Sequence, residues 1–158
     1  MRKGFTMIEL IFVIVILGVL ASVAIPRLAA TRDDAEVAKA ATNLTTAVSD
    51  ITAYYTAKGT FSAVSSDFTK ITNALDKSGN LNVKGSITCV TVSLPTTPTN
   101  QNATDAVNIT LTFKEDDAVC KTLKTLPGIK AMCGKSGSNE NISSTCNIQV
   151  GGSGGIQF

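Results

Sequence analysis

Residues 1–25 read MRKGFTMIELIFVIVILGVLASVAI, and this stretch decides how the chain is built. The segment Phe5–Ile25 is apolar and carries a single charged residue, Glu9. As a helix rising about 1.5 Å per residue it is about 31 Å long, close to the hydrocarbon thickness of a bilayer. Arg2 and Lys3 precede it, so the positive-inside rule places the N-terminus in the cytoplasm and the rest of the chain outside. The sequence therefore predicts one membrane span at the N-terminus.

Two simpler interpretations compete for this segment. A secretory signal peptide has a basic start and an apolar run, and residues 21–24 offer a small-residue cleavage site, but the run is longer than the usual 7–15 residues. A plain membrane anchor accounts for the length but not for Glu9. A carboxylate at the centre of a membrane helix costs about 2.5 kcal/mol or more, so such a residue calls for a partner.

The stretch RKGFTMIEL, residues 2–10, resembles the leader and cleavage motif of type IV pilins and of type II secretion pseudopilins. It combines a basic leader, a glycine, a phenylalanine, and a glutamate as the fifth residue of the mature chain. The similarity extends over about residues 1–58. The resemblance implies that a prepilin peptidase cuts between Gly4 and Phe5 and methylates the new amine of Phe5.

Cleavage after Gly4 would create a positive amine at the start of an apolar helix. Glu9 then has a candidate partner, the Phe5 amine of a neighbouring subunit inside a filament core. Removing one member of a buried ion pair leaves the other uncompensated, at a cost of about 3–5 kcal/mol. We therefore expect Glu9 and Phe5 to set the register of assembly. The alternative is that Glu9 only reaches back to the lipid headgroups.

Gly18 and Pro26 fall where the pilin family has helix-loosening residues. Glycine is about 1 kcal/mol less favourable than alanine in a helix, and proline removes an amide donor. By resemblance, the stretch between them unwinds during assembly. The alternative is that both are tolerated because such residues are common in membrane helices.

A second helical pattern follows Pro26. Apolar residues step by four and three along a narrow stripe, namely Val37, Ala41, Leu44, Val48, Ile51 and Tyr55. This spacing predicts a helix over about 28–57 that ends at Gly59. We expect the stripe to face a sheet, although spacing alone does not distinguish a sheet from a partner helix.

The remaining sequence alternates between strand and short-helix patterns. Asp67 is a candidate cap for a short helix that ends near Gly79, within a connecting region over 59–85. Period-two alternation predicts strands at 86–94 and 107–113, and a last strand is expected at 143–150. A short helix is expected over 115–126, stopped by Pro127 and Gly128.

Together these patterns predict an α+β fold of the pilin type. A long N-terminal helix, half membrane segment and half amphipathic, would pack on a small antiparallel sheet of three or four strands. The expected organisation is a leader at 1–4, a transmembrane or filament-core helix at 5–25, an amphipathic helix at 26–58 and a globular head at 59–158.

The four cysteines all follow the membrane segment, where the compartment permits disulfides. None has the C-x₂-C spacing of a zinc site. Among three arrangements we favour Cys133–Cys146, because it clips the Gly/Ser/Asn-rich segment 134–144, which leaves Cys89–Cys120. The crossed pairings remain open alternatives.

Composition excludes several classes of function. The 158 residues include no histidine, which removes Ser-His-Asp and Cys-His catalysis and His-containing zinc sites. The 14 Lys and Arg against 12 Asp and Glu, without a basic cluster, give no direct nucleic-acid site. Three adjacent acids at 115–117 cannot all face one calcium ion. We expect no catalytic residues, no metal and no cofactor, and therefore no enzyme.

The resemblance implies a structural subunit of a type IV pilus. Its partners would be copies of itself in a helical homopolymer, the prepilin peptidase and an inner-membrane assembly platform. The precursor would cross the inner membrane once and then enter a surface filament. The alternatives are a pseudopilin of type II secretion or DNA uptake, in a periplasmic pseudopilus, and a membrane-anchored binding module that never polymerises.

Overall fold

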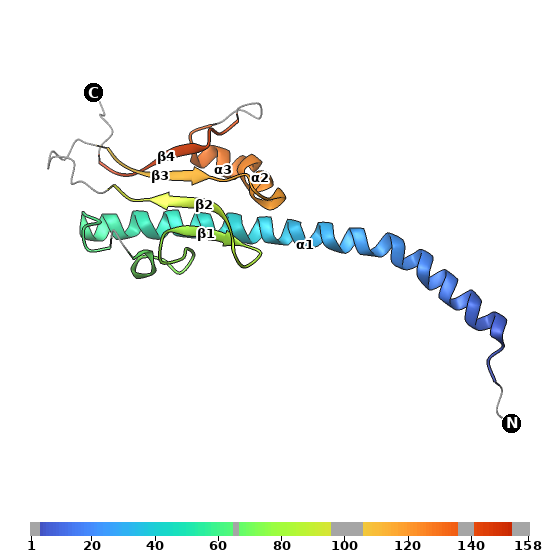
Figure 1. The fold of residues 1–158 in the computed structure, drawn as a ribbon. Helices are drawn as coiled ribbons and strands as arrows, with labels where there is room; N and C mark the ends of the chain where they lie inside the picture. Colours follow the sequence, from blue (N-terminus) through green and yellow to red (C-terminus); the bar gives the residue numbers. More distant parts are fainter. Residues whose placement is uncertain (1–3, 65–66, 96–105, 136–140, 153–158) are drawn as a thin grey trace. The chain divides into compact units, whose positions relative to one another are not determined.

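The structure is a computed structural model that describes residues 4–64, 67–95, 106–135 and 141–152. It contains two compact units, Met1–Ala35 and Glu36–Phe158, and the long helix α1 (Met7–Lys58) crosses the boundary between them (Figure 1). The second unit holds a four-stranded sheet and is called the head below. A long N-terminal helix with a small antiparallel sheet is the α+β architecture that the sequence predicted, and it is consistent with a pilin-like fold.

In the first unit α1 is an uninterrupted helix. Its backbone remains helical through Gly18 and through Pro26. By length and composition it is the one helix among the described residues that is long and apolar enough to cross a membrane. The predicted span is therefore present as a helix.

In the head, one side of α1 is buried along a regular stripe. The fully covered positions are Val37, Ala40, Leu44, Ala47 and Ile51. The sequence had placed Ala41 and Val48 on the centre of this stripe, but both are only half-buried beside it. Because the true centre carries alanine at 40 and 47, the helix backbone can approach its neighbours closely. The helix ends at Lys58, and Gly59 follows with a φ of +70°.

The sheet is an antiparallel meander whose spatial order is the sequence order. Its strands are β1 (Asn80–Val83), β2 (Ile87–Ser93), β3 (Val107–Phe113) and β4 (Thr145–Gly151). The last three match the predicted strands to within one or two residues. Strand β1 was missed because the sequence assigned 59–85 to a connection.

The helix expected between Asp67 and Gly79 is a single 3₁₀ turn, η1 (Phe68–Lys70). Asp67 does cap it, since its carboxylate accepts from the N–H of Thr69. The chain then turns, because the Asp76 carboxylate accepts from the N–H groups of Ser78 and Asn80 at 2.9 and 2.8 Å. These bonds start β1 where the sequence pattern had continued a helix.

The segment after β3 forms two short helices rather than one. Helix α2 (Ala118–Thr125) begins at Asp117, whose side chain caps it by accepting from Val119 N–H at 2.8 Å. Helix α3 (Pro127–Met132) starts at the proline that was expected only to stop the helix. Proline fits this first position, where its missing N–H has no partner to lose.

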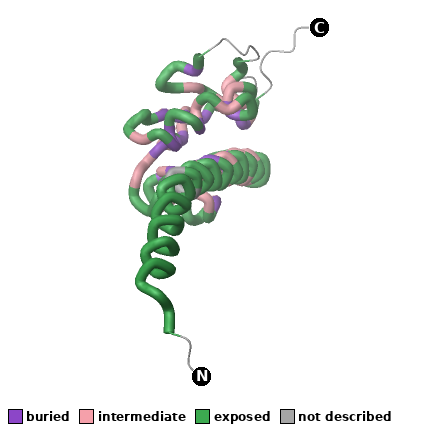
Figure 2. Tube along the Cα trace, turned by 90° about the vertical axis from the view of Figure 1, so that its right-hand side faces the viewer, coloured by how far each residue is buried: buried purple, intermediate pink, exposed green. Residues whose placement is uncertain are grey.

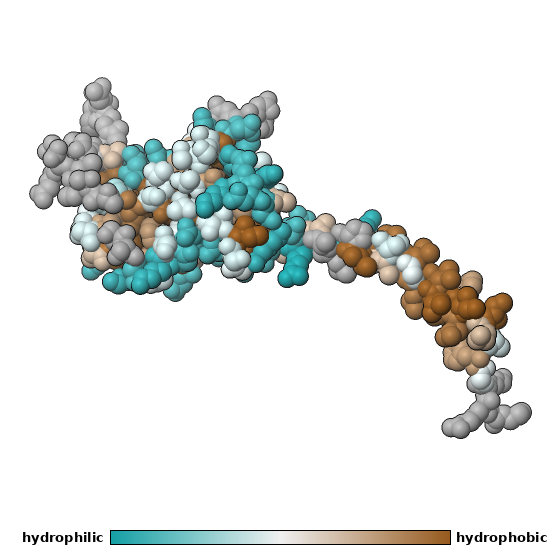
Figure 3. Space-filling model, in the orientation of Figure 1, coloured by the Kyte–Doolittle hydropathy of each residue, from teal (hydrophilic) through white to brown (hydrophobic). Residues whose placement is uncertain are grey.

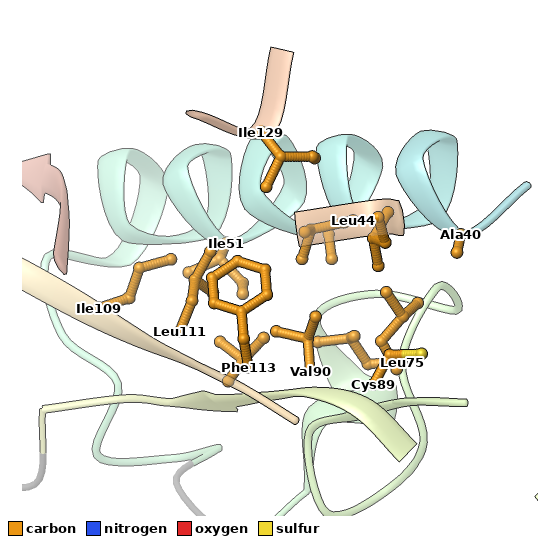
Figure 4. Packing of buried hydrophobic residues seen from close by; sticks show 14 of the residues in the cluster. Ala40, Leu44, Ile51, Leu75, Cys89, Val90, Ile109, Leu111, Phe113 and Ile129 are labelled. Carbon is orange, nitrogen blue, oxygen red and sulfur yellow. The ribbon is translucent and has the colours of Figure 1, made fainter. Parts of the chain in front are cut away.

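The core of the head lies between α1 and one face of the sheet. Figure 4 shows Leu44 and Ile51 of α1 on one side and Val90, Leu111 and Phe113 of the strands on the other. These five side chains are at most 5% exposed. Their burial fixes which face of each strand points inward, and therefore which face remains outside.

Candidate functional site

The most prominent feature of the surface is the apolar first half of α1. Among the described residues, every exposed large hydrophobic side chain lies between Phe5 and Ile25. The exposed fractions run from 43% at Ile16 to 85% at Phe5. Figure 2 shows this segment as exposed, and Figure 3 shows it as almost uniformly hydrophobic. An apolar surface of this extent marks a site that a membrane or other protein covers.

Thr6 and Glu9 cap the N-terminus of this helix. The N–H and the hydroxyl of Thr6 donate to the same Glu9 carboxylate oxygen, at 2.9 and 2.7 Å, and the Glu9 N–H approaches the Thr6 hydroxyl oxygen at 3.4 Å. This reciprocal arrangement is a capping box, which satisfies N–H groups that the first helical turn leaves unpaired. The sequence interpretation missed Thr6, although the pattern Thr-x-x-Glu before an apolar run is its usual signature.

The predicted cleavage site lies before this cap. A Cβ atom placed on Gly4 would have no other atom within 4 Å, and Phe5 is the most exposed apolar residue of the segment. A Cβ placed on Gly18 likewise meets nothing within 4 Å. The Phe5–Glu9 pair was predicted between neighbouring subunits, and it stays a prediction.

Two disulfides join the strands of the head to α2 and α3. Cys89 of β2 is joined to Cys120 of α2, with a Cα–Cα distance of 4.9 Å. Cys133 at the end of α3 is joined to Cys146 of β4, with a Cα–Cα distance of 5.5 Å. These are the bridges that the sequence favoured. The first is buried, with both cysteines 1% exposed, and the second is half-buried.

Two of the three acids at 115–117, Glu115 and Asp117, have structural roles. The N–H of Val119 holds the pKa of Asp117 below its usual value against the smaller opposing effect of burial, and Lys84, at 3.2 Å from the carboxylate, lowers the pKa further. Glu115 forms an ion pair with Lys124, which lowers the pKa of Glu115. In the part of the chain that the structure describes, no group of acids and cysteines could hold a metal ion.

One open hollow of about 420 Å³ lies between α2, α3 and the segment before β4. Its lining is mainly basic and polar, comprising Glu115, Lys121, Lys124, Thr125, Lys130, Asn141 and Ile142. Within this lining, Glu115 pairs with Lys124.

Comparison with known proteins identifies the N-terminal segment. Residues 1–25 match the family described as the prokaryotic N-terminal methylation motif. Neither a curated protein nor a solved structure matches the chain. The matched residues contain the predicted cleavage site, the capping box and the exposed large hydrophobic side chains of α1. The match at residues 1–25 therefore supports a class III signal of the kind found in prepilin-like substrates of the type IV pilin and pseudopilin class.

Proposed function

We propose that this chain is the structural subunit of a type IV pilus. A prepilin peptidase removes residues 1–4, methylates the amine of Phe5, and leaves a mature chain that polymerises through its apolar helix. Loss of Arg2 and Lys3 brings the side-chain charges from 14 basic and 12 acidic to a balance of 12 and 12. The exposed apolar surface of α1 carries this proposal. The hydrophobic effect drives its insertion into the membrane, and neighbouring subunits cover it in the filament.

The capping box gives the proposed assembly contact a defined geometry. The carboxylate of Glu9 is held over the first turn of α1 by Thr6, at the same end of the helix as the new Phe5 amine. A carboxylate near a helix N-terminus is stabilised by the helix dipole while it remains charged. It is therefore ready to receive the Phe5 amine of a neighbouring subunit when the two helices slide into register.

The location of the chain changes with its processing in this proposal. The precursor crosses the inner membrane once, with its head outside the cytoplasm, where the two disulfides can form. The assembly platform then moves the processed subunit from lipid into the filament core. Apolar side chains leave one apolar environment for another, so the transfer of α1 costs little, and pairing of Glu9 sets where each subunit stops.

The decisive experiment is mass spectrometry of the N-terminus of fibres sheared from producing cells. We expect a chain that begins at methylated Phe5, and we expect fibres in electron micrographs of the parent strain but not of a deletion strain. A fibre-free protein that begins at Met1 would contradict the proposal in favour of a membrane-anchored module. A chain that begins within residues 21–25 would contradict it in favour of a secretory signal peptide.

The same strains separate a pilin from a pseudopilin. A pilin gives surface fibres at its native expression level, and its deletion leaves protein secretion intact. If fibres appear only on overproduction and deletion blocks the release of secreted enzymes, the pseudopilin assignment replaces the pilin one.

A further inference from the structure

The sheet has a second face, opposite to the one that packs on α1. The pairing register and the burial pattern place on this face a set of residues that are neither charged nor apolar. We call it the threonine face, and it consists of Asn80, Asn82, Thr88, Thr91, Ser93, Asn108, Thr110, Thr112, Thr145, Asn147 and Gln149. All of them are exposed or half-buried, whereas their inward neighbours along the strands are mostly buried.

These residues form rows that cross the strands. The paired positions give one row over all four strands and two shorter rows beside it, namely Asn80–Thr91–Thr112–Thr145, Ser93–Thr110–Asn147 and Asn108–Gln149. Neighbouring strands lie about 4.8 Å apart and alternate residues along a strand about 6.8 Å apart. The rows therefore present hydroxyl and amide groups on a regular grid.

Hydrogen bonds within the face fix these side chains before any ligand arrives. The hydroxyl of Thr110 donates to the Asn147 side-chain oxygen at 2.9 Å. The hydroxyls of Thr91 and Thr88 donate to the oxygens of Asn80 and Asn82 at 2.9 and 2.8 Å. A side chain that is already ordered loses less conformational entropy on binding.

These bonds also determine what the face offers. Each of the donating threonines has used its proton, so its oxygen presents lone pairs only. The amide nitrogens of Asn80 and Asn82 donate to Asp76 at 3.1 and 3.2 Å. The amide nitrogen of Asn147 makes no hydrogen bond to the described residues. The face thus combines acceptors on threonine with a donor on Asn147.

Charge and area restrict the partner. The strand residues of this face include no Lys, Arg, Asp or Glu, and the Asp76 carboxylate at its β1 edge is hydrogen-bonded by Asn80 and Asn82. The face therefore attracts a polyanion or a polycation only weakly, and it lacks the large apolar side chains that anchor a protein interface. The three rows span about 14 Å by about 14 Å, or about 200 Å². A stable interface with a second copy of the chain needs about 800 Å² on each partner. Figure 3 shows the head as pale to polar, with small hydrophobic areas.

We propose that the threonine face binds neutral polysaccharide. The hydroxyl groups of an uncharged sugar polymer both donate and accept, so they match acceptors on threonine and a donor on Asn147. A few sugar units of an extended chain cover the grid. This inference does not depend on polymerisation, since the face belongs to a single head.

The test is retention of the full chain, purified in detergent micelles, on insoluble cellulose, chitin and cross-linked dextran. The variant Thr110→Val/Thr112→Val removes two hydroxyls and keeps the β-branched shape that suits a strand. The matched control Thr42→Val/Thr45→Val removes two exposed hydroxyls from α1, where each only donates to a helix carbonyl. Circular dichroism and size-exclusion chromatography check that all three proteins are folded and of equal size.

We expect at least one neutral polysaccharide to retain the parent and the control, and the face variant to be retained about tenfold less, as the loss of two hydrogen-bonding groups implies. Retention of none of the three polymers overturns the proposal. It is equally overturned if the face variant is retained as strongly as the parent on the polymer that binds the parent. A change of oligomeric state in the face variant would overturn it in favour of a second copy.

Discussion

The N–H and the hydroxyl of Thr6 donate to one carboxylate oxygen of Glu9, at 2.9 and 2.7 Å. The same carboxylate is proposed to meet the Phe5 amine of the next subunit. Glu9 therefore combines two tasks, since its hydrogen-bonding capacity closes its own helix and its charge recruits a neighbour. Substitutions at this position separate the two tasks.

Glu9→Gln should retain the helix cap but lose assembly. Glutamine serves in a capping box as glutamate does, yet it carries no charge for the Phe5 amine. We expect few or no fibres by electron microscopy and normal cleavage before Phe5 by mass spectrometry. Abundant fibres from this variant would show that capping, and not charge, is what assembly requires. Thr6→Ala is the complementary control, because it weakens the cap by about 1 kcal/mol while leaving the charge in place.

Gly4→Leu should leave the precursor uncut. A peptidase that acts between Gly4 and Phe5 must admit residue 4 at its active site, and the present residue has no side chain there. The expected result is full-length protein, beginning at Met1, in the inner-membrane fraction on immunoblots. Gly4→Ala, a smaller change, should be cut slowly. Normal processing of the leucine variant would place the cleavage site elsewhere.

Gly151→Ala should destabilise the head by about 1–3 kcal/mol, as overpacking of a filled site does. A Cβ atom on Gly151 would lie 2.0 Å from a ring carbon of Tyr55, and that ring packs against Phe61 with a centroid distance of 5.3 Å. The thermal unfolding temperature of the detergent-solubilised chain reports the change. The control is Gly128→Ala in α3, where the new Cβ meets nothing within 4 Å, so it should be neutral or slightly stabilising.

Acid should weaken the head through Asp76. Burial raises the pKa of Asp76, but the N–H of Asn80, with the side chains of Asn80 and Asn82 and the N–H of Ser78, lowers it below the ordinary value. A carboxyl with a lower pKa in the folded state stabilises the fold above its unfolded pKa of about 3.9, and this contribution is lost as the pH falls through the folded pKa.

We therefore expect the unfolding temperature to fall as the pH drops below about 4, and Asp76→Asn to reduce that pH dependence. Asp116→Asn, at an exposed carboxyl, should leave the dependence as it is in the parent. Identical pH profiles for the parent and Asp76→Asn would refute the role given to these hydrogen bonds.

Limited reduction should open Cys133–Cys146 before Cys89–Cys120. Thiol–disulfide exchange requires access to sulfur. The bridge Cys133–Cys146 is half-buried, whereas Cys89 and Cys120 are each 1% exposed. Brief exposure to a dithiol followed by alkylation should label positions 133 and 146 first, as peptide mapping reports. In denaturant all four cysteines should react alike, and equal labelling in the folded protein would contradict this order.

The sequence predicted the features whose patterns are long. The apolar segment before Pro26, the amphipathic half of α1 and the strands around Val92 and Ile109 each repeat a period over several residues. A hydrophobic period that repeats over several residues indicates the secondary structure more strongly than the conformational preference of any single residue. The favoured disulfide pairing followed from how little apolar surface lies between Cys133 and Cys146.

Short elements were missed because single contacts create them. Strand β1 depends on the turn that Asp76 organises and on pairing with β2, and neither is visible as a period in four residues. Helix α3 begins at Pro127, and the sequence does not show whether a proline ends one helix or occupies the first position of the next. The capping box at Thr6 has a local signature, Thr-x-x-Glu before an apolar run, but the prediction assigned Glu9 only to a contact between subunits.

The two bridges also order the events of folding. Strands that are consecutive in the sequence pair with each other. Both cysteines of the bridge Cys89–Cys120 precede both cysteines of Cys133–Cys146 in the sequence. When the chain emerges N-terminus first, the first two cysteines can meet before the others are available, and the last two are then left for each other. Vectorial emergence thus favours the observed arrangement among the three that four cysteines allow.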